Sequence, residues 1–437
     1  MNFELLKKSH LKRNIMIGIV AVLIISAVIL NPTRAKYRVT KSIPLVNGTI
    51  NYSLPDFNVI GLYINGEEAT ELDSSKSYTL DTTQSSCTYK DGSTINNLNI
   101  SYDSDTGELQ ISPFTTKGTK CTLYFEERVS VSDTLLANYP TLLTRDDFST
   151  TVTNTTTGTI YYEDTSKGRT YYFAGNPTDN WVRWAGFYWR IIRINEDGTI
   201  RMIYQGTSAN ATGTGTQLAS ASTFNSSHNN NAYVGFKYTS GQVHGIGTNS
   251  TILTALNNWF NTSGIAANYA NDLDGNAGFC NDRQPSTSTS TSNGSGGTGT
   301  TTTYYGAFIR LFNGWNTNNA LPSFECANSS DLFTTSGSSQ GNRALTNPIG
   351  LITADEVVYA GGIIEANNQS YYLFTGQNYW TMSPCEFSGG DFSMFYVSSG
   401  MLTWGGGTYS VRPVINLRAD VTIQSGDGTS SNPYVVS

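Results

Sequence analysis

The chain has 437 residues, a formal net charge of −7, only 14% charged residues, and many glycines (42) and tyrosines (26). Helix-rich cytosolic enzymes carry more charge than this, so the composition favours a β-rich extracellular protein. Aromatic residues make up 12% of the chain, which is too many for a disordered protein. No cluster of Lys and Arg follows the N-terminal segment, which excludes nucleic-acid binding.

The N-terminal segment, residues 1–35, contains an uncharged apolar run at 15–30 that follows four basic residues. A membrane-spanning helix needs about 20 apolar residues, and the core of a cleavable signal has about 7–15. An uncleaved anchor and a cleaved signal therefore both stay open. We expect a transmembrane helix here, with the protein held at the cell membrane by this single N-terminal pass and its bulk outside the cell.

Residues 36–130 have the pattern of a small all-β domain. The apolar stretch 57–64 leads into Asn65-Gly66, a dipeptide typical of β-hairpin turns. Short strand-like stretches follow between Cys87 and Cys121, which suits one disulfide within the domain. These features predict an immunoglobulin-like β-sandwich, followed by a polar linker at 131–150.

Residues 151–437 predict an α+β domain of short strands and long loops. Two apolar runs, 187–194 and 199–204, surround a turn that ends in Gly198 and predict a β-hairpin. The stretch 251–260 has the spacing of an amphipathic helix. Another short helix is expected after Thr353, which can form a capping box with Glu356. Residues 285–303 are a low-complexity loop rich in Ser, Thr and Gly.

All five cysteines follow the apolar N-terminal run. Cys280 and Cys326 bracket the low-complexity loop and are expected to form a second disulfide beside Cys87–Cys121, which leaves Cys385 as the odd thiol. Five reduced, buried thiols are the alternative. No C-x-x-C motif occurs, so zinc ribbons and thioredoxin-like redox sites are not indicated.

Residues with catalytic or metal-binding chemistry are sparse. His228 and His244 lie in Asn-, Ser- and Gly-rich surroundings that suit solvated loops. The acidic turn 272–276 could offer oxygen ligands to calcium, but it lacks the closing Glu of an EF-hand loop, so a plain turn is the simpler interpretation. We expect no catalytic residue, no metal site and no cofactor.

The stretch 376–417 carries the remaining signal, with aromatic residues scattered among Gly, Ser and Thr. This composition is typical of binding loops, where rigid aromatic rings are displayed on an adaptable backbone. The alternative is that Phe387, Phe392 and Trp404 belong to the core. The glycines at 405–407 favour an exposed loop.

Four segments resemble a group of uncharacterised, membrane-anchored surface proteins of Gram-positive gut bacteria: 188–199, 279–283, 350–356 and 411–429. Their C-terminal domain is similar to the C-type-lectin-like fold of formylglycine-generating enzymes and of the variable proteins of diversity-generating retroelements. In the variable proteins, loops near the C-terminus contact ligands and are hypervariable. The resemblance places the matching positions here at Cys385, Phe387, Asp391, Phe392, Trp404, Thr408 and Tyr409.

Two departures from these families limit what the resemblance implies. The calcium-dependent sugar motifs E-P-N, Q-P-D and W-N-D are absent, and Cys385 has no neighbouring second cysteine. We therefore predict a surface-displayed binding or adhesion protein that recognises a protein or glycan ligand through residues 385–410. The alternatives are an extracellular hydrolase of cell wall or glycans, which needs a cleft with paired carboxylates, and a structural pilus-like subunit, in which the contact aromatics are buried.

Overall fold

The computed structural model describes residues 58–73, 77–103, 107–112, 119–128, 130–286, 296–312 and 321–436. Within these ranges, no helix is long and apolar enough to cross a membrane. The predictions of a transmembrane helix and of a single-pass membrane location are corrected accordingly. The segment on which they rested, residues 1–35, lies outside the described residues, as do residues 287–295 of the low-complexity loop.

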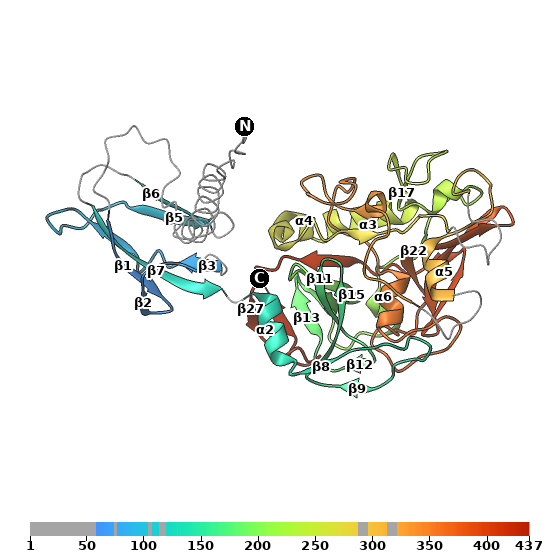
Figure 1. Cartoon of the computed structure of the whole chain (residues 1–437), viewed down its shortest axis with the longest axis horizontal. Helices are drawn as coiled ribbons and strands as arrows, with labels where there is room; N and C mark the ends of the chain where they lie inside the picture. The colour runs from blue at the N-terminus through green and yellow to red at the C-terminus, as the bar shows by residue number, and fades with distance from the viewer. Residues whose placement is uncertain are drawn as a thin grey trace, which may run out of the picture. The chain divides into compact units, whose positions relative to one another are not determined.

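The chain divides into two compact units between Arg128 and Val129, and Figure 1 shows the elements of each. The first unit has a five-stranded sheet in the order β2-β1-β7-β3, with β4 also paired to β7, and a separate β5–β6 hairpin. Strand β1 runs parallel to β7. The strands are β1 (Asn58–Ile64), β2 (Glu67–Ala69), β3 (Ser77–Leu80), β4 (Ser86–Thr88), β5 (Asn99–Asp103), β6 (Glu108–Ser112) and β7 (Lys120–Arg128).

The disulfide of the first unit differs from that of an immunoglobulin domain. Cys87 and Cys121 are bonded and are also register partners on the adjacent strands β4 and β7. In immunoglobulin domains the disulfide joins two facing sheets, whereas here it links two neighbours within one sheet. The immunoglobulin-like sandwich predicted for residues 36–130 is therefore not the arrangement observed. Leu62, Leu109 and Phe125 belong to the core that the sheet and the hairpin share.

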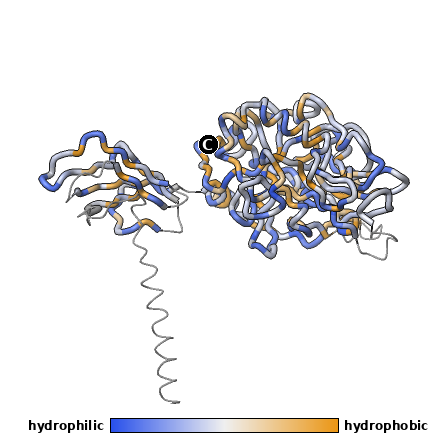
Figure 2. Tube along the Cα trace, turned by 90° about the horizontal axis from the view of Figure 1, so that it is seen from above, coloured by the Kyte–Doolittle hydropathy of each residue, from blue (hydrophilic) through white to orange (hydrophobic). Residues whose placement is uncertain are grey.

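The second unit is built around a nine-stranded sheet with β14 at its centre, paired to β13, β11 and β15. A four-stranded sheet, β20-β22-β23-β24, lies elsewhere in the same unit. Apolar segments gather in the interior of the second unit (Figure 2). The longer strands are β8 (Thr141–Leu143), β10 (Thr159–Thr165), β11 (Gly168–Tyr172), β13 (Trp181–Trp184), β14 (Phe187–Ile194), β15 (Ile200–Gly206), β22 (Tyr379–Ser388), β23 (Asp391–Ser398), β24 (Met401–Gly405), β26 (Val414–Leu417), β27 (Ile423–Ser425) and β28 (Tyr434–Val436).

Two-residue strands and short helices complete the second unit. The two-residue strands are β9 (Thr155–Thr156), β12 (Asn176–Pro177), β16 (Ser222–Thr223), β17 (Lys237–Tyr238), β18 (Thr248–Asn249), β19 (Phe279–Cys280), β20 (Thr303–Tyr304), β21 (Leu332–Phe333) and β25 (Thr408–Tyr409). The α-helices are α2 (Val131–Asn138), α3 (Thr251–Thr262), α4 (Ile265–Asn268), α5 (Gly306–Phe312) and α6 (Ala354–Tyr359), and the 3-10 helices are η1 (Gly213–Thr216), η2 (Asn231–Val234), η3 (Ala270–Asp272) and η6 (Ser329–Asp331).

The predicted class, an α+β C-type-lectin-like domain, is wrong for this unit, which is mostly β with few helices. The longest described helix, α3, has 12 residues, because only this segment keeps a long amphipathic pattern. Residues 131–150, predicted as a linker, instead contain α2 and β8, and the backbone N–H of Val131 donates to the carbonyl of Val421. The predicted hairpin is confirmed as β14–β15, and the capping box of Thr353 and Glu356 is present at α6.

Candidate functional site

The predicted contact residues lie on strands rather than on loops, and three of them are buried. Cys385 and Phe387 belong to β22 and Phe392 to β23. Their exposed fractions are 0%, 1% and 4%. Side chains buried to this degree cannot contact a ligand unless the sheet opens. The alternative interpretation of Phe387 and Phe392 as core residues is therefore the correct one.

The other predicted residues reach the surface, but most of their side chains already contact other residues of the protein. Asp391 is exposed and pairs with His228 at 3.1 Å, and Thr408 is exposed at the start of β25. The Trp404 ring packs edge-on against the ring of Phe312. The Tyr409 ring stacks on Tyr396, with 4.1 Å between centroids. These rings consequently serve packing within the protein as well as its surface.

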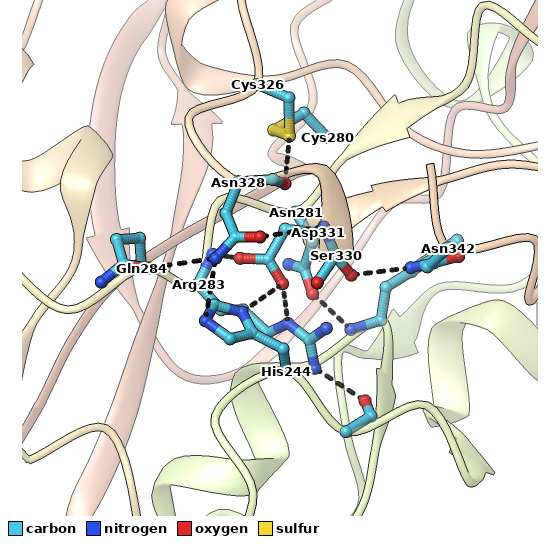
Figure 3. Close-up of polar contacts among 12 residues, drawn as sticks. His244, Cys280, Asn281, Arg283, Gln284, Cys326, Asn328, Ser330, Asp331 and Asn342 are labelled. Atoms are coloured by element: carbon cyan, nitrogen blue, oxygen red, sulfur yellow. Dashed lines mark hydrogen bonds and ion pairs between the residues drawn. A yellow bond between two sulfur atoms is a disulfide. The ribbon is translucent and has the colours of Figure 1, made fainter. Parts of the chain in front are cut away.

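Sequence reasoning missed a polar cluster around Asp331, which Figure 3 shows beside the Cys280–Cys326 disulfide. The carboxylate of Asp331 is fully buried. Its Oδ1 lies 2.9 Å from Nδ1 of His244 and accepts a bond from Nε of Arg283 at 2.8 Å. The backbone N–H of Arg283 donates to its Oδ2 at 2.6 Å. His244 is thus held by a buried carboxylate rather than solvated in a loop.

This cluster resembles part of a catalytic triad but has no nucleophile. The Nε2 atom of His244 lies 3.2 Å from Nδ2 of Asn328 (Figure 3), so both ring nitrogens have partners. Among the described residues, no hydroxyl or thiol bonds to this ring. Asn328 follows Cys326 closely, and its carbonyl oxygen lies 3.4 Å from the disulfide-bonded sulfur of Cys326. The cluster therefore ties the two halves of the disulfide region to the loop of His244.

Both predicted disulfides are confirmed, since Cys87 is bonded to Cys121 and Cys280 to Cys326. Cys385 is free and buried, and this burial raises the pKa of its thiol well above the ordinary value. A protonated, inaccessible thiol is unreactive. Two disulfides in a β-rich chain are consistent with an extracellular protein.

A charged cavity of about 410 Å³ lies beside the Cys280–Cys326 disulfide in the second unit. Its wall includes residues of β14, β15, α5 and α6 and the segment 323–326. Four basic and six acidic side chains line it: Lys167, Arg193, Arg201, Arg310, Glu196, Asp197, Asp282, Glu325, Asp355 and Glu356. The buried members of this set must be paired with each other, with water or with a ligand.

The first set of charges in the cavity centres on Glu356. Its Oε1 lies 2.5 Å from Nε of Arg201 and accepts a bond from Nε of Arg193 at 3.1 Å. The capping box holds the side chain in place, because the backbone N–H of Thr353 donates to Oε2 at 2.9 Å. Burial opposes ionisation of Glu356, but the charges of Arg201 and Arg193 outweigh it and lower its pKa.

The second set of charges centres on Arg310, whose Nη2 donates to Asp282 at 2.7 Å and to Asp355 at 2.9 Å. Asp355 is saturated, because its Oδ1 also accepts bonds from Nε of Arg310 and from the backbone N–H of Ser323. Asp282 has fewer hydrogen-bond partners than Asp355. Burial raises its pKa even though Arg310 acts in the opposite direction, and its Oδ1 has no hydrogen-bond partner in the described part of the chain.

Arg193 is the arginine of the cavity wall whose Nη donors have no partner within the described ranges. Apart from the bond from its Nε to Glu356, the side chain of Arg193 makes no hydrogen bond to any described residue. Its guanidinium carbon lies over the Phe324 ring, 4.9 Å from the centroid. Phe324 in turn stacks on Tyr359, with 3.8 Å between ring centroids. The guanidinium plane is therefore supported by packing, while neither Nη atom bonds to a residue that the structure describes.

The acidic turn at 272–276, interpreted as a plain turn with calcium binding as the alternative, is used within the protein. Asp272 accepts a bond from the Trp184 indole at 2.8 Å, and Asp274 accepts bonds from the backbone N–H groups of Asn276 and Ala277. Among the residues that the structure describes, no group of three or more His, Cys, Asp or Glu side chains could hold a metal ion.

The cavity is suited to binding a polar ligand, since it combines fixed charges with donors and acceptors that the protein leaves unpaired. The Cys280–Cys326 disulfide lies on its wall, and the stacked rings of Phe324 and Tyr359 support the guanidinium of Arg193. Comparison with protein-family models, with curated proteins and with solved structures found no match to the chain, so its function is inferred from its own geometry.

Proposed function

We propose that the chain is an extracellular binding protein that holds a small polar ligand in the charged cavity of its second unit. The observation that carries the proposal is Arg193, a side chain only 11% exposed whose two Nη atoms have no partner among the described residues. These donors are not among the buried atoms that lack a partner, so water can reach them in the cavity and a ligand can replace that water.

This proposal keeps the predicted binding function but moves the site. Residues 385–410 are mostly strands of a packed sheet, and Phe387 and Phe392 belong to its core. The cavity, by contrast, has a volume within the usual range of small-molecule sites, about 300–1,000 Å³. We therefore place ligand recognition at the unpaired charged groups of the cavity rather than at aromatic rings in residues 385–410.

A second candidate function, an extracellular hydrolase, is favoured by Asp282 and Asp355. Both bond to a single nitrogen of Arg310, which brings them close enough for the paired carboxylates of glycoside hydrolases, about 5–10 Å apart. The raised pKa of Asp282 suits a general acid. Asp355 is less suited to act as the second catalytic carboxylate, because both of its oxygens already accept hydrogen bonds. Binding without turnover is the simpler reading.

The experiment is a ligand screen by thermal shift and calorimetry on the full chain, using sugars, sugar acids, amino acids, short peptides and inorganic phosphate. Binding that is lost in Arg193→Gln and kept in Arg183→Gln supports the proposal. Arg183 is an exposed arginine on the neighbouring strand β13, so it controls for the change of charge. Product formation that is lost in Asp282→Asn would establish the hydrolase instead, and no Arg193-dependent binding would refute the binding function.

A further inference from the structure

Resting on the proposed function, we infer that the ligand is a small hydroxy acid, such as an acidic monosaccharide. Its carboxylate pairs with the two free Nη atoms of Arg193, and one of its hydroxyl groups bonds to the free Oδ1 of Asp282. The inference depends on two groups that the protein supports firmly but leaves unsatisfied.

The free edge of Arg193 selects a planar anion. The Nε atom is held by Glu356 at 3.1 Å, and the guanidinium lies on the Phe324 ring. Both contacts fix the plane of the guanidinium group. Two parallel N–H groups on a fixed plane match the two oxygens of a carboxylate, which is the strongest arrangement available to arginine.

The charge of the surrounding wall favours a carboxylate over a phosphate. Six acidic side chains line the cavity against four basic ones, and Arg201 and Arg310 are already paired with protein carboxylates. Among the arginines of the wall, only Arg193 keeps both of its Nη atoms without a partner in the described part of the chain. One singly charged anion can be matched there, whereas a doubly charged phosphate would meet repulsion from the acidic residues.

Asp282 specifies the second group of the ligand. The side chain is 3% exposed, its Oδ2 is held by Arg310 at 2.7 Å, and its Oδ1 has no partner within the described ranges. Burial raises the pKa of this carboxyl. A hydroxyl group can donate to the ionised form and accept from the protonated form. A hydroxyl group therefore fits the ionised and the protonated carboxyl. An ammonium group fits only the ionised form, because it has no acceptor.

The test is calorimetric titration of the full chain with matched pairs of compounds: D-glucuronate and D-galacturonate against D-glucose and D-galactose, and D-gluconate against sorbitol. In each pair the ligands differ by the carboxylate. We expect at least one acid to bind about tenfold or more tightly than its neutral partner. Arg193→Gln should remove this preference, Arg193→Lys should restore part of it, and Arg183→Gln should leave it intact.

The hydroxyl contact is tested separately with cyclohexanecarboxylate, which keeps the carboxylate and lacks every hydroxyl. Asp282→Asn should weaken the sugar acid several-fold and leave cyclohexanecarboxylate unchanged. Equal losses for both compounds would refute the hydroxyl contact.

The outcomes also separate this inference from the proposed function. Arg193-dependent binding of a neutral sugar, an amino acid or inorganic phosphate in preference to every sugar acid would overturn the ligand class and leave the binding function standing. Absence of Arg193-dependent binding by any compound in the wider screen would overturn both.

Discussion

Replacing Glu356 with Gln should destabilise the second unit strongly, because it removes the one negative charge shared by two buried arginines. Arg201 is 2% exposed and Arg193 is 11% exposed, and both lie within about 3 Å of the Glu356 carboxylate. Gln has nearly the same shape, and its amide oxygen can still accept the N–H of Thr353. The substitution therefore removes the charge and preserves the helix cap.

The expected loss follows from the burial of the pair. Removing one partner of a buried ion pair costs about 3–5 kcal/mol, because the remaining charge is left uncompensated. Loss of a helix cap alone costs about 1 kcal/mol. We therefore expect Glu356→Gln to lower the free energy of unfolding by about 4 kcal/mol at pH 7, and Thr353→Ala, the matched control, to lower it by about 1 kcal/mol.

The pH dependence has a definite sign. The folded-state pKa of Glu356 is lowered from its ordinary value of 4.5, so its ionisation stabilises the fold above that value. This contribution is lost as the pH falls through the lowered pKa. The difference between wild type and Glu356→Gln should therefore be full at pH 7 and shrink steadily below pH 4.5.

The assay is urea unfolding followed by tryptophan fluorescence. All seven tryptophans follow residue 128, so the signal reports on the second unit, and the buffer must keep the disulfides oxidised. The reasoning is refuted if Glu356→Gln costs no more than Thr353→Ala at pH 7, or if the cost of Glu356→Gln does not depend on pH.

Three further predictions concern other parts of the chain. Replacing Cys87 and Cys121 with Ala should destabilise the first unit by about 3–4 kcal/mol, as expected for a separation of 34 residues; protease sensitivity of the first unit at rising urea measures it, and an unchanged profile would contradict it. Cys385 should not react with Ellman's reagent until the chain unfolds, since the thiol is buried with a raised pKa; fast reaction of the native protein would show that the burial is wrong. Hydrogen bonds from Thr83 and Gln84 lower the pKa of Asp81 to about 2, so Thr83→Ala should raise it, as measured by NMR titration.

The features predicted well from sequence are those with local signals. The β14–β15 hairpin is marked by two apolar runs around a short turn, and the capping box by the spacing of Thr353 and Glu356. The disulfides followed from cysteine number and position. Burial of Phe387 and Phe392 could not be predicted in this way, because β22 is buried on both faces for most of its length and shows no alternation of polar and apolar residues.

The cavity was not predicted, because its charges come together only in the folded chain. Arg193 and Glu356 are 163 residues apart, and Arg310 and Asp355 are 45 apart. One signal was nevertheless present. Arg193 and Arg201 are embedded in strongly apolar strands, and a charged residue in such a strand must find a partner. A search for acidic residues that could pair with them would have led to this site.

The position of the last strands has a consequence for biosynthesis. Strand β26 pairs with β15, and β28 lies between β27 and β13. The central sheet of the second unit is therefore incomplete until Val414–Leu417 and Tyr434–Val436 are available. Most of its core residues precede these strands and stay exposed until the strands have left the ribosome, which favours slow folding of the second unit.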